Sequence, residues 1–169
     1  MVYLDPSSKN QLWILPMEGA PAGGQKPVPF APSEFNSSWG QFSPDGRWIA
    51  YASDESHRNE IYVAPFPGPG AKKQISTAGG DQPVWRNDGK EIFYIGADRR
   101  LMAAEVISKG DVLELGAVRP LVSLIGAYYP GHTYDVSADG QRFLVRTGVQ
   151  PANPEALTVV RNWTAELKK

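Results

Sequence analysis

The 169-residue sequence contains no cysteine, which excludes disulfide bonds and metal sites built on thiolates. Histidine is almost as scarce, because only His57 and His132 occur, far apart and without a carboxylate pattern beside either. No apolar run approaches the roughly 18 residues that cross a bilayer, and the first six residues lack both regions of a signal peptide. We therefore expect no metal, no other cofactor and no membrane insertion.

A block of one charge sign is also missing. The formal net charge is −1, and 17 basic and 18 acidic residues are scattered along the chain. A nucleic-acid-binding protein usually carries a basic stripe or patch, so no nucleic acid is predicted as a partner. Glycine and proline, in contrast, are plentiful, with 17 and 15 residues in a chain that is 41% hydrophobic. Such a composition is typical of a globular domain with many short strands and tight turns.

Three segments of the sequence share an Asp-Gly pair. In each, an apolar residue lies three positions before the aspartate, and a short apolar run begins four positions after it. The aspartates are 43 and 51 residues apart, and the pairs are Asp45-Gly46, Asp88-Gly89 and Asp139-Gly140. A repeat of this length, with runs rich in β-branched and aromatic residues, indicates strands that recur in equivalent units.

The chemistry of the Asp-Gly pair explains why it recurs. In Ser43-Pro44-Asp45-Gly46, proline presets the first central dihedral of a type I turn, the aspartate accepts bonds from nearby backbone, and glycine adopts positive φ. Each pair is predicted to join two antiparallel strands, so these aspartates and glycines have a structural role. A Ca²⁺ loop would need several carboxylates at alternating positions, and each turn offers one.

A second element repeats between the turns. Residues 12–17 match residues 61–66, residues 101–106 form a weaker copy, and residues 157–160 form a plausible fourth. After each of the first three comes a short segment with a basic or proline start, at 26–29, 73–76 and 119–122. Proline and lysine are suited to a sheet edge, so these segments are predicted as outer fourth strands.

The order of these elements predicts an all-β fold, a β-propeller built from blades of four antiparallel strands. The whole chain, 1–169, is predicted as a single partial propeller domain of about three blades, half of a six-bladed propeller. Its blades cover approximately 11–30 (a partial blade), 39–77, 82–123 and 132–163.

The sequence of residues 41–66, from Gln-Phe-Ser-Pro-Asp-Gly to Ile-Tyr-Val-Ala-Pro-Phe, resembles the TolB-type, WD-repeat-like propeller repeat. The later turns depart from it, with Asn87 and Ala138 in place of the proline. More narrowly, residues 65–70, 82–94 and 161–163 look like the C-terminal propellers of bacterial serine/threonine protein kinases. That resemblance implies a sensor or interaction module, often in an extracytoplasmic or periplasmic location.

Catalytic motifs are missing from the sequence. It has no glycine-rich loop before a strand lysine, no His-Arg-Asp, no Asp-Phe-Gly and no Gly-x-Ser-x-Gly. Residues 68–73 lack the Gly-Lys-Ser/Thr ending of a phosphate loop. We therefore predict a noncatalytic binding or sensor module for a protein or small ligand, not an enzyme. The alternative is an accessory propeller of a larger enzyme, a kinase or a prolyl-oligopeptidase-type hydrolase, whose catalytic domain lies elsewhere.

One face of the propeller is the predicted binding surface. The links from fourth to first strands and from second to third strands lie together there, around the channel mouth, and loops on a rigid scaffold commonly carry function. The candidate ligand-binding residues are Trp39, His57, Arg58, Gln82, Arg99, His132 and Tyr134. In the competing interpretation, Trp39 and Tyr134 pack between blades, and residues 54–59 form a solvated hairpin loop.

Three blades are fewer than a closed propeller needs, since propellers typically have four to eight. Open ends would expose unpaired strand edges and apolar faces. We therefore expect a two-fold symmetric homodimer that forms a six-bladed ring, in which residues 12–17 and 157–162 compete for one strand position. The rival hypothesis places the remaining blades upstream in a longer parent chain.

Overall fold

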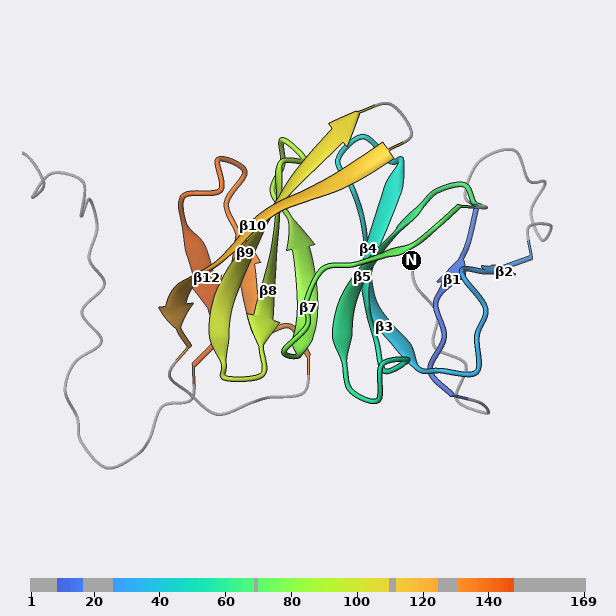
Figure 1. The fold of residues 1–169 in the computed structure, drawn as a ribbon, viewed down its shortest axis with the longest axis horizontal. Coiled ribbons are helices and arrows are strands. Elements are labelled where there is room, and N and C mark those ends of the chain that lie inside the picture. The colour runs from blue at the N-terminus through green and yellow to red at the C-terminus, as the bar shows by residue number, and fades with distance from the viewer. Residues whose placement is uncertain (1–8, 17–25, 69, 110–111, 125–130, 148–169) are drawn as a thin grey trace, which may run out of the picture.

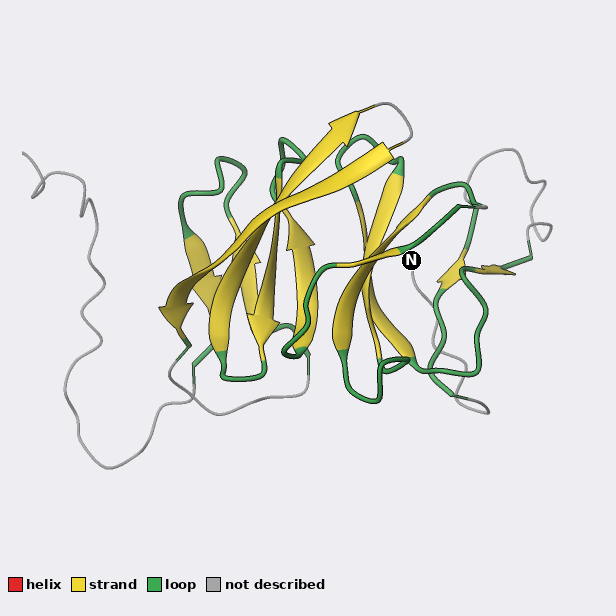
Figure 2. Cartoon of the chain, in the orientation of Figure 1, coloured by secondary structure: helices red, strands yellow, loops and turns green. Residues whose placement is uncertain are grey.

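The computed structural model describes residues 9–16, 26–68, 70–109, 112–124 and 131–147, which contain twelve strands and no helix. The predicted all-β fold is confirmed (Figure 2). Within these residues no helix is long and apolar enough to cross a membrane.

Two four-stranded antiparallel sheets form the centre of the fold, and each keeps its strands in chain order (Figure 1). The first holds β3 (Ser37–Phe42), β4 (Trp48–Ser53), β5 (Glu60–Pro65) and β6 (Lys73–Gln74). The second holds β7 (Gly80–Trp85), β8 (Glu91–Gly96), β9 (Arg100–Lys109) and β10 (Val112–Ser123). Four strands that pair in sequence order make one propeller blade. We call these sheets the first and second full blades.

A two-stranded antiparallel sheet lies on each side of the full blades (Figure 1). The leading pair consists of β1 (Trp13–Ile14) and β2 (Val28–Pro29), and the trailing pair of β11 (Tyr134–Val136) and β12 (Phe143–Val145). The strand predicted at 157–160 lies outside the described residues.

The outer strand of the second full blade differs from its prediction. A short edge strand was expected at 119–122, but β10 extends over twelve residues and pairs with β9 through two register shifts. The extra length forms a hairpin that reaches back over the first full blade, where Leu113 is buried in one cluster with Trp48 and Val63. The outer strand at 119–122 is therefore confirmed as part of β10. Its greater length was not predicted, because Leu113 packs with residues of another blade, which no local pattern encodes.

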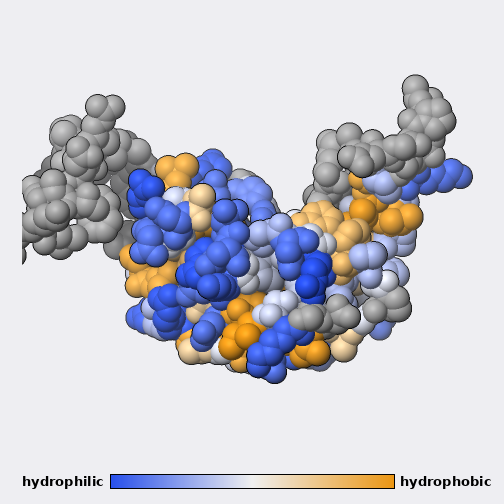
Figure 3. Space-filling view, turned by 90° about the horizontal axis from the view of Figure 1, so that it is seen from above, coloured by the Kyte–Doolittle hydropathy of each residue, from blue (hydrophilic) through white to orange (hydrophobic). Residues whose placement is uncertain are grey.

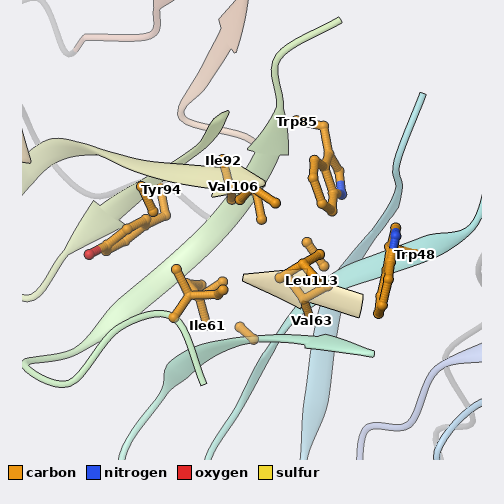
Figure 4. Packing of buried hydrophobic residues seen from close by; sticks show 12 residues of the cluster. Trp48, Ile61, Val63, Trp85, Ile92, Tyr94, Val106 and Leu113 are labelled. Carbon is orange, nitrogen blue, oxygen red and sulfur yellow. The ribbon is translucent and has the colours of Figure 1, made fainter. Parts of the chain in front are cut away.

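Face-to-face packing of the sheets forms the core. Alternate residues of β4 point to opposite sides, so Trp48, Ala50 and Ala52 pack against the second full blade. The residues between them, Ile49 and Tyr51, pack against the leading pair. Figure 4 shows the first of these interfaces, where Trp48, Ile61 and Val63 meet Trp85, Ile92, Tyr94, Val106 and Leu113.

The second full blade repeats this arrangement. On β8, Ile92 and Tyr94 face the first full blade, whereas Phe93 faces the trailing pair. There the rings of Phe93 and Phe143 meet edge to face, with centroids 5.0 Å apart. The second strand of each full blade is therefore buried on both sides.

The three Asp-Gly turns have the predicted geometry. In each, the glycine N–H donates to the carbonyl three residues earlier, and the aspartate Oδ1 accepts the N–H two residues later. The glycines have positive φ, at 70° for Gly46, 72° for Gly89 and 70° for Gly140. The side chains of these aspartates are therefore engaged within their own turns.

Different residues support the aspartate in different turns. Ser43 Oγ donates to Asp45 at 2.6 Å and Ser137 Oγ to Asp139 at 2.5 Å, and these hydrogen bonds lower the pKa of both carboxyl groups. In the second full blade Arg86 contacts both oxygens of Asp88, at 2.7 Å each. The bonds from Arg86 lower the pKa of Asp88 to about 2.

Substituting Gly46 with valine tests the turn conformation. No atom lies within 4 Å of a Cβ at Gly46, so any cost comes from a β-branched residue at positive φ, and we expect a loss of about 1–3 kcal/mol. Gly68 provides the matched control, because its Cβ would also meet nothing within 4 Å and its φ is not positive. Thermal and urea unfolding measure the effect. Equal melting temperatures for G46V and G68V would contradict the positive φ of Gly46 in this turn.

The low pKa of Asp88 predicts a loss of stability in acid. In the folded protein this pKa is about 2, whereas an unfolded aspartate titrates near about 3.9. The folded state thus gains stability above the unfolded pKa, and this gain disappears as the pH falls from about 4 to about 2. We expect Asp88→Asn to unfold at a lower urea midpoint than wild type at pH 6. At pH 2.5 the two midpoints should lie closer together. If the urea midpoints of wild type and Asp88→Asn differ by the same amount at pH 6 and at pH 2.5, the Asp88 carboxylate does not contribute stability in this way.

Candidate functional site

The predicted channel-mouth face lies at the end of the blades opposite the Asp-Gly turns. The hairpin loops that follow β4 and β8 reach this end, as do the link that leads into β7 and residues 131–133, which come directly before β11 (Figure 1). Because β3 pairs with β4 from Ser37 opposite Ser53, the first residues of each inner strand are closest to this face. The inner strands therefore present their opening residues at the mouth.

Both inner strands of the full blades begin with a bulge. The register shifts between Ser38 and Gln41 on β3, and between Asp81 and Val84 on β7. Within these bulges Trp39 has φ of 58° and Gln82 has φ of 52°. Positive φ in a bulky residue is uncommon and costs on the order of 1–3 kcal/mol. The same strained conformation thus occurs at the same position of two blades, beside the mouth.

Gln82 connects the second full blade to the trailing pair. Its buried amide donates to Gly131 O at 3.3 Å and to Thr133 Oγ1 at 3.2 Å, and its Oε1 accepts the Thr133 N–H at 2.7 Å. The Tyr134 hydroxyl donates to Gln82 O at 2.8 Å, and burial raises the pKa of Tyr134 well above its usual value. Gln82 and Tyr134 are thereby positioned to hold the blades together.

Trp39 and His132 form an aromatic pair at the mouth. Their ring centroids are 4.9 Å apart at an interplanar angle of 70°. Trp39 comes from the first full blade and is half-buried, because it packs against the core cluster between the two full blades, as the competing interpretation expected. His132 precedes the trailing pair and is exposed. The pair therefore brings together residues from either side of the second full blade and leaves aromatic surface accessible.

The remaining candidates lie in the hairpin loops. His57 and Arg99 occupy equivalent turn positions, with φ of 71° and 61°, and their N–H groups donate to Asp54 O and Gly96 O at 2.9 Å. Arg58 and Arg99 line a hollow of about 300 Å³ between the two blades, together with Asn59, Gly79, Gly80, Asp81, Ile95, Gly96 and Ala97. The seven candidates thus divide into the Trp39, Gln82, His132 and Tyr134 group and the residues of the two hairpins.

Glu60 is a buried residue that the sequence analysis missed. Its Oε1 accepts from Arg58 Nε at 2.8 Å and from the Gly79 N–H at 2.9 Å, and its Oε2 accepts from the Ser76 hydroxyl. Arg58 also donates to Thr77 O at 2.9 Å. These bonds tie the hairpin after β4 to the link into β7, so Arg58 has a structural role. The sequence held one indication of this burial, because Glu60 lies directly before the apolar run Ile61–Ala64.

The opposite end of the blades carries a second hollow. About 320 Å³ lies between Trp48 and Trp85, beside Asp45 and Asp88 of the turns. Figure 3 shows this end, where hydrophilic residues are interspersed with smaller hydrophobic groups. Trp85 Nε1 donates to Gln41 O at 3.2 Å. Across the part of the chain that the structure describes, no three histidine, aspartate or glutamate side chains are grouped to hold a metal ion.

No protein-family model matches the chain, and no curated protein does. Among solved structures, TolB from Acinetobacter baumannii is similar, with 18% sequence identity and a TM-score of 0.44 over 88% of this chain. The match covers 47% of that protein, so this chain spans about half of its length. The resemblance to kinase propellers stays a prediction.

Removing the Glu60 carboxylate should loosen the link between the full blades. Glu60→Ala leaves the Gly79 N–H and the Ser76 hydroxyl without an acceptor, and each orphaned buried donor costs about 1–3 kcal/mol. We expect a lower melting temperature and faster protease cleavage at Thr77–Ala78, which is exposed. Glu114→Ala is the control, since Glu114 is exposed and its ion pair with Lys109 lies at the surface. Equal cleavage rates in the two variants would show that the Glu60 hydrogen bonds do not hold the link into β7 in place.

Proposed function

We propose that this chain is a noncatalytic β-propeller module that binds a protein segment at its channel-mouth face. The aromatic pair of Trp39 and His132 carries this proposal, because Trp39 is held by strained backbone while the half-buried Trp39 and the exposed His132 both keep accessible surface. Strain of this kind persists where the surrounding structure enforces it and is concentrated at functional sites.

The chemistry of the pair suits an apolar or aromatic anchor on the bound segment. Tryptophan offers a large rigid surface with a polar N–H, which makes it a frequent hot spot at interfaces. The hollow beside Arg58 and Arg99 adds guanidinium groups and backbone at the same end of the blades. A short extended segment could place its anchor on Trp39 and its polar backbone along this hollow.

The proposed role is recognition, without turnover. The sequence contains neither the kinase motifs nor a nucleophile elbow, and the strongly held carboxylates Asp45, Asp88 and Asp139 support turns. The same module would also serve as the accessory domain of a larger enzyme. We extend to it the extracytoplasmic location that the kinase-propeller resemblance implies, as part of this proposal.

Selection from a displayed library of random peptides tests the proposal. Peptides are selected on the wild-type chain, and their dissociation constants are then measured for wild type, Trp39→Ala, His132→Ala and Phe42→Ala. Phe42 is the control because it is an exposed aromatic residue at the other end of the same strand. We expect enriched peptides to bind Trp39→Ala at least about tenfold more weakly, a loss of about 1.4 kcal/mol, and to bind Phe42→Ala normally.

Two results would overturn the proposal. One is an enriched set of peptides whose affinity does not change in the Trp39 and His132 variants. The other is a set that depends on Phe42 instead, which would move the binding surface to the Asp-Gly end.

A further inference from the structure

The leading and trailing pairs correspond to different halves of a blade. The trailing strands β11 and β12 are joined by the Asp139-Gly140 turn, as β3 and β4 are joined by Asp45-Gly46. They are therefore first and second strands. The leading strand β1 lies in the segment that matches β5, and β2 pairs with it as β6 pairs with β5. They are therefore third and fourth strands.

The trailing pair has one apolar position that its surroundings do not cover. Counting from the Asp-Gly pairs, Leu144 corresponds to Ala50 and Phe93. The next blade buries both of those residues, which are 0% and 1% exposed, whereas Leu144 is 77% exposed. On the other side of the same strand, Phe143 packs against the second full blade as expected. Leu144 thus lies on a face that equivalent residues use to contact a following blade.

The leading pair is already seated as half of a preceding blade. Leu12 and Phe30 are buried against Ile49 and Tyr51 of the first full blade, and the rings of Phe30 and Tyr51 meet edge to face at 5.8 Å. In a complete blade the third strand also pairs with a second strand, as β5 pairs with β4. Among the described strands, β1 pairs with β2 alone and β12 with β11 alone.

We propose that a second copy of this chain completes both half-blades, with β12 of one copy pairing with β1 of the other. The register follows from the first full blade, where Ala50 is opposite Val63 and Tyr51 opposite Tyr62. Leu144 is then opposite Ile14 of the second copy, and Val145 is opposite Trp13. Each junction forms one composite blade.

The number of blades selects a second copy over closure within one chain. One chain would join its own halves into a ring of three blades, fewer than the four to eight that propellers have. Two copies related by a two-fold axis give four full and two composite blades, a ring of six. Both sheet edges are then paired, and Leu144 is covered, which removes features that otherwise favour aggregation.

Mixed cross-linking of the full chain tests the register. The native chain has no cysteine, so I14C and L144C variants with different tags each carry a single thiol. Directly opposite residues in an antiparallel pair meet the distance needed for a disulfide. We expect oxidation of the mixture to give a disulfide-linked species containing both tags. The control pair is I14C with D135C, which lies one strand further from the β12 edge and should not cross-link.

Light scattering on a size-exclusion column tests the assembly itself. We expect a mass about twice the 18.5 kDa of one chain and a melting temperature that rises with concentration. L144D should shift the mass to one chain, whereas V122D should leave it unchanged, because Val122 is 51% exposed on the outer strand β10.

A soluble monomer with no mixed cross-link would overturn the proposal. In that case the occupant of the Leu144 face is either residues 157–162 of the same chain or further blades of a longer polypeptide. If L144D fails to fold, the cross-linking experiment still tests the dimer, because I14C and L144C place a small apolar side chain, and no charge, at the junction.

Discussion

The fold depends on one constraint, which is that the second strand of each blade is buried on both of its faces. β4 and β8 have no solvent-facing side, because one set of alternate residues faces the preceding blade and the other set faces the following one. A single blade cannot bury both faces of its own second strand, so each sheet is stable only when it packs between two neighbouring sheets. Small residues such as Ala50 and Ala52 let the sheets approach, while Trp48, Trp85 and Phe93 fill the space between them.

The same stacking sets the geometry of the mouth. Once the sheets pack face to face, the openings of the inner strands converge, and the bulges turn Trp39 and Gln82 toward the neighbouring links. Gln82 then satisfies the backbone around Thr133, and Glu60 does the same for the link between the full blades. Trp39 packs with one part of its side chain on the core and meets the exposed His132 with another. The accessible aromatic pair is thus a consequence of rigid buried contacts around it.

Local chemistry decides how much of this could be predicted from the sequence. The Asp-Gly turns and most strands were predictable, because turn residues and alternating apolar positions act within a few residues. The long β10, the positive φ of Trp39 and the burial of Glu60 were not, since each depends on a residue from another blade or link. The candidate site shows the same division. Sequence position placed Trp39 and His132 at the mouth. Only three-dimensional contacts show that Gln82, Tyr134 and Arg58 hold the structure together and that Trp39 both packs on the core and contacts His132.

The long hairpin of β9 and β10 changes how the molecule can come apart. In a stack of repeats, each unit ordinarily opens with an energy set by its own contacts and those with its neighbours. Leu113 belongs by sequence to the second full blade and by packing to the first as well. Neither of these blades can open without withdrawing that side chain, so the two form a single cooperative unit. The end of the same strand extends this connection to the trailing pair, because Leu121 packs in the cluster that holds Tyr134 and Phe143.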